Sequence, residues 1–187
     1  MLIVRLVTMF MLAIIFSSSL YACEKKLTRT VTLQPSDGES IDIASIELQK
    51  QKDGSYHYKL NVDDSKFSNH FLSMRPFKCF EGPKQMLCYL PYPYEKNNKI
   101  SAEDLGNLEY DLLFIHRKST DYGIDPWNGV YYKLEMDKDA NLLGVLKEVD
   151  LDILAAPPEK GVTRPITDSA LNEAEPSGHS YPTLVIK

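Results

Sequence analysis

The sequence is short of basic residues. Its 187 residues include 21 Lys and Arg against 26 Asp and Glu, and the formal net charge is -5 at pH 7. A surface that binds nucleic acid needs clustered Lys and Arg side chains to displace counterions. The composition therefore argues against DNA and RNA as partners.

Glycine and cysteine are scarce as well. Nine Gly and three Cys exclude a collagen-like repeat and a small domain held together mainly by disulfides. The hydrophobic fraction of 43% and the charged fraction of 25% are typical of a globular protein, not of a disordered chain or a coiled coil. A chain of this length predicts a single domain.

The sequence contains no recognisable catalytic constellation. No Gly-rich loop follows a predicted strand, so nucleotide binding has no support. The segment Gly178-His179-Ser180-Tyr181-Pro182 is not a Gly-x-Ser-x-Gly nucleophile elbow, because Pro182 replaces the last glycine and no His follows Ser180. The four histidines lack the spacing of a zinc site, so we expect exposed or half-buried rings at His57, His70, His116 and His179. We predict no cofactor, and a non-catalytic role is favoured.

A long apolar run occurs near the N-terminus. Residues 6–16 are apolar apart from Thr8, Arg5 is the only charge before them, and three serines follow. The run is shorter than the ~20 residues of a transmembrane helix and is typical of the hydrophobic region of a signal peptide. We therefore predict that residues 1–22 are a signal peptide.

Leu20-Tyr21-Ala22-Cys23 resembles the lipobox of bacterial lipoprotein precursors, with Leu three positions before the cysteine and a small residue directly before it. Tyr21 departs from the pattern, which has a small residue at that place. The resemblance implies cleavage before Cys23 and acylation of its thiol, which anchors the protein to a membrane. Glu24 replaces the Asp that retains lipoproteins at the inner membrane, which implies an outer-membrane lipoprotein facing the periplasm or the surface. The alternative is ordinary cleavage after Ala22, giving a soluble periplasmic or secreted protein.

Cys79 and Cys88 remain as a pair once Cys23 carries lipid. An odd number of cysteines in an oxidising compartment indicates a separate role for one of them. The pair flanks a predicted turn at residues 81–84. We therefore predict a disulfide that bridges the arms of a hairpin, and a loop of this size contributes roughly 2–3 kcal/mol of stability.

Alternation of apolar and polar residues dominates after residue 28 and predicts strands. Asp53-Gly54 separates two alternating runs, which is a strong hairpin signal. Hairpins are predicted at residues 41–62, 74–90 and 130–151, and a further strand is predicted at 109–117.

Helix is expected to be scarce. Ser101 predicts the start of one short helix, and Thr167 or Asp168 predicts another that runs to Glu175. We predict a mainly β fold in residues 23–158, a single antiparallel β-barrel or β-sandwich domain with one or two short helices, and an α+β fold as the alternative. Residues 159–187 are expected to form a surface tail, which could return at 183–186 as a final edge strand.

A spacing typical of calcium loops occurs in the turn of the third hairpin. Asp137, Asp139, Asn141 and Glu148 match the first, third, fifth and twelfth positions of an EF-hand loop. Leu142 occupies the sixth position, where the sharp turn requires Gly, and the flanking residues alternate like strands. We therefore predict a polar hairpin turn without metal, with these four residues as the alternative ligands.

Aromatic residues in loop-like stretches are the better indication of a binding surface. Tyrosines interleave with prolines at residues 89–94, and a second aromatic stretch spans 121–129. Such side chains offer a large contact area at a low entropic cost. The predicted binding surface comprises Tyr89, Tyr92, Tyr94, Tyr122 and Trp127. The alternative is that these rings cap the ends of the sheet core.

These observations predict a lipid-anchored, non-catalytic protein of the cell envelope that binds a protein or a glycan. The membrane is reached through the lipid on Cys23. The alternative is a small periplasmic hydrolase or a ligand carrier with a cavity inside a closed β-barrel.

Overall fold

The computed structural model describes residues 26–73 and 75–187. The predicted signal peptide, the lipidation site Cys23 and the first residue of the second hairpin, Met74, lie outside the described residues.

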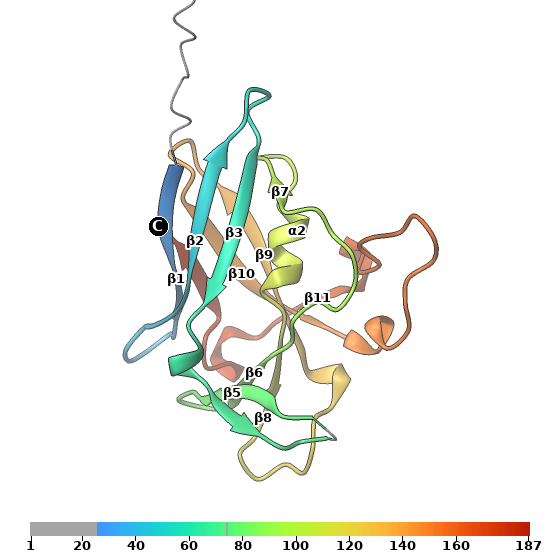
Figure 1. Cartoon of the computed structure of the whole chain (residues 1–187). Helices are drawn as coiled ribbons and strands as arrows, with labels where there is room; N and C mark the ends of the chain where they lie inside the picture. Colours follow the sequence, from blue (N-terminus) through green and yellow to red (C-terminus); the bar gives the residue numbers. More distant parts are fainter. Residues whose placement is uncertain (1–25, 74) are drawn as a thin grey trace, which may run out of the picture.

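The described residues form one antiparallel sheet of twelve strands, in which mainly neighbouring chain segments pair (Figure 1). The spatial order is β4-β5-β6-β8-β9-β10-β12-β1-β2-β3-β7, and β11 pairs with β10 beside this path. The strands are β1 (Lys26–Gln34), β2 (Ile41–Lys50), β3 (Tyr56–Val62), β4 (Ser68–His70), β5 (Phe77–Glu81), β6 (Met86–Tyr89), β7 (Lys99–Ile100), β8 (Phe114–Arg117), β9 (Gly129–Met136), β10 (Leu142–Val149), β11 (Leu171–Glu173) and β12 (Thr183–Ile186). The predicted mainly β fold is confirmed, together with all three hairpins.

The sheet curls around one main core but does not close into a barrel. Apolar side chains of β1 and β2 meet those of β9, β10 and β12 in this core, which includes Val31, Ile46, Tyr132, Leu146 and Leu184. Within the described residues, the terminal strands β4 and β7 are not paired with each other. The fold is therefore a sandwich-like domain, and a closed barrel is not formed.

One α-helix, α2 (Gly106–Asp111), occurs in the described residues, and the other helical segments are single 3₁₀ turns. These turns are η1 (Asp64–Lys66), η2 (Pro126–Asn128), η3 (Leu151–Leu154), η4 (Asp168–Ala170) and η5 (Pro176–Gly178).

The strand predicted at residues 109–117 is only half correct. Residues 114–117 form β8, whereas residues 109–111 belong to α2. The helix buries Leu108 in the main core and Tyr110 in a second core, which also contains Tyr92, Leu113, Ile115 and Tyr131. An apolar residue at every second position fits both a strand and a short helix that is buried on two sides.

The helix also begins later than predicted. Ser101 Oγ accepts hydrogen bonds from the backbone N–H groups of Glu103 (3.3 Å) and Asp104 (3.2 Å), which produces a turn instead of a helix. Asp104 Oδ1 then accepts the N–H of Gly106 (3.1 Å), where α2 starts. The second predicted helix is reduced to η4, and the chain continues as β11.

The C-terminal strand lies in the interior of the sheet and not at its edge. β12 pairs with β1 on one side and with β10 on the other. Leu184 and Ile186 are completely buried and complete the main core. The strand expected at residues 183–186 is therefore present, but the expectation that it lies at an edge is wrong, because alternate residues of β12 supply apolar surface that the core needs.

The predicted disulfide is present between Cys79 and Cys88, which face each other in the register of β5 and β6. Disulfides are typical of exported proteins in an oxidising compartment. In the described part of the chain, no helix has the length and apolar character needed to cross a membrane.

Candidate functional site

The residues with calcium-loop spacing do not converge. The Asp137 carboxylate accepts the N–H groups of Asp139 (2.8 Å) and Asn141 (2.9 Å) and the Asn141 side-chain amide (2.9 Å). Glu148 lies near the opposite end of β10, about 20 Å along the strand at ~3.4 Å per residue. Asp137 therefore organises a hairpin turn, and Glu148 belongs to a different part of the molecule.

The Tyr-Pro stretch is mainly a packing element. Tyr92 is 8% exposed and its hydroxyl donates to the backbone oxygen of Thr163 (2.5 Å). Tyr94 is half-buried and its hydroxyl donates to the backbone oxygen of Leu154 (3.0 Å). Tyr89 is half-buried as well. The prediction of an exposed platform is wrong for Tyr92, because its ring fills the second core and its hydroxyl holds the chain after β10.

The other predicted aromatics do reach solvent. Tyr122 is fully exposed and Trp127 is 72% exposed. Phe71, which the sequence analysis did not single out, is also largely exposed. The loops that carry Phe71 and Tyr122 approach each other, since a Cβ atom on Gly123 would lie 3.6 Å from the backbone oxygen of Leu72.

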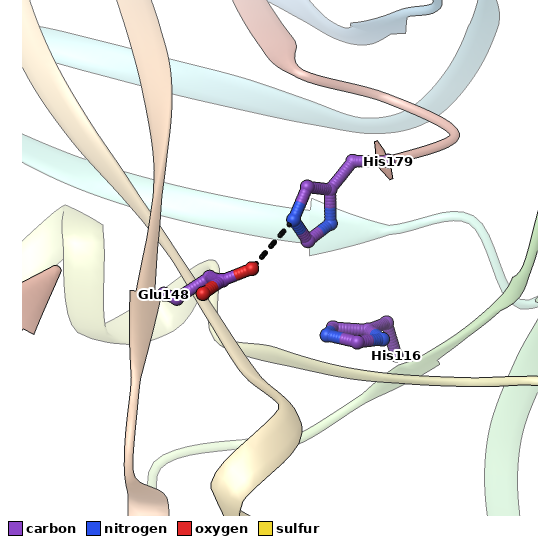
Figure 2. A group of neighbouring side chains, drawn as sticks. All are labelled: His116, Glu148 and His179. Carbon is purple, nitrogen blue, oxygen red and sulfur yellow. Dashed lines mark hydrogen bonds and ion pairs between the residues drawn. The ribbon is translucent and has the colours of Figure 1, made fainter. Parts of the chain in front are cut away.

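Two histidines and Glu148 converge in a cluster that the spacing of the histidines did not predict. Figure 2 shows His116, Glu148 and His179 pointing toward one another from separate chain segments. His179 Nε2 lies 2.9 Å from Glu148 Oε1, and the rings of His116 and His179 meet edge to face with centroids 5.1 Å apart. One donor atom from each residue lies within 4.8 Å of the other two.

His179 is held from both sides. Its ring is buried, and Gln85 Nε2 lies 3.0 Å from Nδ1. With this amide donating to Nδ1, the neutral ring carries its proton on Nε2 and donates it to Glu148. The ring is therefore oriented toward Glu148 before any ligand arrives.

His116 differs from His179 because its nitrogens are available. Within the described residues, no hydrogen-bond partner contacts the ring of His116. Burial lowers its pKa below the usual 6.5, and the nearby His179 lowers it further, while Glu148 and Asp121 oppose the shift. The ring is thus mainly neutral at pH 7 and keeps a lone pair free.

The sequence does contain a pattern that indicates the cluster, but it can be recognised only once the inward-facing side of each strand is known. Along β10, Leu142 and Leu146 face the main core, and Glu148 follows on the same side of the strand. On β8, His116 follows the core residue Phe114 in the same way. Polar residues thus continue two inward-facing apolar rows where the core ends.

Ser180 attaches the segment that carries His179. Its buried Oγ accepts the N–H groups of Lys84 (3.0 Å) and Gln85 (2.9 Å) and donates to the Gln85 backbone oxygen (3.0 Å). A Cβ atom on Gly82 would lie 2.6 Å from Ser180 Cβ, so this close approach requires glycine. The hydroxyl is therefore a structural link between the β5–β6 turn and the C-terminal segment.

No protein-family model, curated protein or solved structure matches the chain. The case for a function therefore rests on its own side chains.

A second polar group lines a surface pocket of about 340 Å³ beside α2. Each cation there has a carboxylate partner: Lys133 Nζ lies 2.8 Å from Asp168, and Arg164 contacts both oxygens of Asp104 (2.5 and 3.0 Å). These pairs satisfy one another, so this pocket gives less reason to infer a ligand than the cluster around His116.

Proposed function

We propose that this chain is a non-catalytic binding protein of the cell envelope, anchored through lipid on Cys23, and that it binds a glycan. The observation that supports the proposal is the position of the exposed aromatic side chains. Tyr122 lies in the connection between β8 and η2, at the end of the domain remote from the start of β1 (Figure 1). An anchor that precedes β1 would leave this end pointing away from the membrane.

A glycan fits the chemistry of this end better than a protein does. A surface pocket of about 520 Å³ is lined by Asp121, Asp125 and Asn128, together with Arg117 and Tyr122. Carboxylates accept and amide groups donate hydrogen bonds, which matches the hydroxyl groups of sugars. The exposed ring of Tyr122, which lines this pocket, can cover the apolar face of a sugar ring. The volume lies within the usual range for small-ligand sites.

The competing carrier function needs a cavity inside a closed barrel. The sheet is open, and its interior is occupied by the apolar side chains of the main core. The open sheet and its filled interior therefore argue against the carrier function.

The glycan proposal predicts that the double variant Tyr122→Ser, Trp127→Ser loses binding while it keeps its stability. We expect retention on purified envelope glycans to fall at least ~10-fold, because aromatic anchors dominate such contacts. The melting temperature should stay close to that of the wild type, since both rings are exposed. Val162→Ser, which changes an exposed apolar residue in another loop, is the matched control.

Equal retention of the double variant and the wild type would refute this assignment. Capture of a protein partner by a wild-type chain that binds no glycan would also contradict it.

The anchor proposal predicts that Cys23→Ser moves the protein from the membrane fraction to the soluble fraction. Several acyl chains hold a protein firmly, whereas none remains on serine. Incorporation of a labelled fatty acid, followed by fractionation, measures the effect, with Ser19→Ala as the control. Fatty-acid labelling that persists in the Cys23→Ser protein would be inconsistent with an anchor at this residue.

A further inference from the structure

We propose that His116, Glu148 and His179 form a binding site for a divalent transition-metal ion, and that zinc is the ion they fit best. This inference is independent of the proposed glycan function, because it concerns the end of the main core and not the exposed aromatic loops.

The donor set matches zinc in its chemistry. Zinc binds imidazole nitrogen and carboxylate oxygen, and two His with one Glu leave a fourth position open in a tetrahedral site. Calcium and magnesium prefer sites made of oxygen ligands, so two imidazole nitrogens favour a transition metal over both.

The geometry is close to that of a bound site. Bonds of about 2.0–2.2 Å to a tetrahedral ion place the donor atoms about 3.3 Å apart. His179 Nε2 and Glu148 Oε1 are already 2.9 Å apart, and all three donors lie within 4.8 Å of one another. Only His116 has to approach by about 1–2 Å, and its ring has no hydrogen bond within the described residues that would resist this movement.

The site is both oriented and reachable. The Glu148 side chain is 44% exposed, so an ion can enter from solvent, whereas the His179 side chain is only 5% exposed. A metal ion on His179 Nε2 requires the other tautomer of the ring, in which the proton has moved from Nε2 to Nδ1.

Gln85 supplies the support that metal-binding histidines usually have. A ligating imidazole typically donates its other N–H to an acceptor that fixes the ring orientation. Rotation of the Gln85 amide by half a turn presents Oε1 instead of Nε2 to His179 Nδ1, at the site of the present 3.0 Å contact. Gln85 can therefore hold His179 in both the free and the metal-bound protein.

The placement of this group on the sheet also favours a ligand. The three residues come from β8, β10 and the segment after η5, and two of them continue apolar rows of the main core. Polar residues on a solvated surface need no fixed position relative to the core. A metal site, in contrast, needs donor atoms held by rigid elements.

Zinc titration of the exported protein against a chromophoric chelator tests the proposal. We expect one zinc ion per chain, and at least a ~10-fold weaker affinity in His116→Ala. Glu148→Gln, which can still accept the hydrogen bond from His179, should weaken zinc binding as well. His57→Ala is the matched control, because His57 is exposed on β3, away from the cluster, and its loss should leave the affinity unchanged.

A second measurement separates binding from folding. Zinc should raise the melting temperature of the wild type but not that of His116→Ala, because a ligand stabilises only the state that binds it. Cobalt should give the visible spectrum of a tetrahedral ion with nitrogen and oxygen ligands in the wild type alone. Equal zinc affinity in the wild type and in a folded His116→Ala protein would overturn the proposal, as would stabilisation by calcium but not by zinc.

Discussion

Glu109→Ala should lower the free energy of unfolding by about 3–5 kcal/mol. Glu109 is 2% exposed, and its carboxylate accepts hydrogen bonds from the Tyr131 hydroxyl and from the backbone N–H of Leu134 (2.8 Å). Hydrogen bonds to charged groups contribute about 1.5–3 kcal/mol each. Alanine removes both bonds and leaves two buried donors without a partner.

Glu109 lies beside an edge of β9 whose backbone N–H groups need hydrogen-bond acceptors. β8 pairs with β9 at Gly129 and Val130, and no other strand of the described residues lies beside this edge of β9 from Tyr131 onward. Helix α2 covers that edge, and Glu109 takes the place of a neighbouring carbonyl group. Burial raises the pKa of Tyr131, and Glu109 raises it further, which keeps the hydroxyl protonated as a donor.

Urea unfolding of the Ala and Gln variants measures this contribution. Glu109→Gln retains an oxygen that can accept the N–H of Leu134, so it should lose less stability than Glu109→Ala. The slope of unfolding free energy against urea should stay constant if only stability changes. A loss below about 1 kcal/mol in Glu109→Ala would show that water satisfies both donors.

Tyr92→Ala should cost a similar amount, about 3–5 kcal/mol, as expected for a large aromatic side chain removed from a core. The Tyr92 ring packs edge to face against Tyr110 (4.7 Å between centroids) and against Tyr94 (5.6 Å). Its hydroxyl also holds the backbone of Thr163. Truncation therefore opens a cavity and releases the segment after η3 at the same time.

Tyr92→Phe separates the two contributions, because it removes only the hydroxyl and should cost about 1 kcal/mol. Tyr122→Ala is the matched surface control and should leave the stability within about 0.5 kcal/mol of the wild type. If Tyr92→Ala unfolded at the same urea concentration as the wild type, the second core would not depend on this ring.

The hairpins could be predicted because their signals are local. Asp53-Gly54 separates two alternating runs, and Gly54 adopts a positive φ of 84° in the turn between β2 and β3. The disulfide could be predicted for a similar reason, since Cys79 and Cys88 lie on either side of one turn. In each case the partners are a few residues apart, and turn chemistry alone sets the pairing.

The remaining features depend on contacts between distant residues. Whether Tyr110 belongs to a strand or a helix depends on how the two cores pack around it. The alternation of apolar and polar residues carries no information about that packing. The proposed metal site is of the same kind: the spacing between His116 and His179 carries no information until the fold brings both rings together with Glu148. The exposure of Tyr92 and Tyr94 likewise depends on where Leu154 and Thr163 lie.

The interior position of β12 sets the order in which the domain can fold during synthesis. Val31 of β1 and Leu142 of β10 both pair with Ile186, and within the described residues β1 and β10 have no direct pairing with each other. The hairpins on the two sides can form early, but they cannot be joined until residues 183–186 have emerged. Folding that waits for such distant contacts is slow, so the chain stays incompletely folded until then. Until β12 inserts, β1 and β10 expose open edges that can pair with other chains, which makes this interval the one in which the protein is most prone to aggregation.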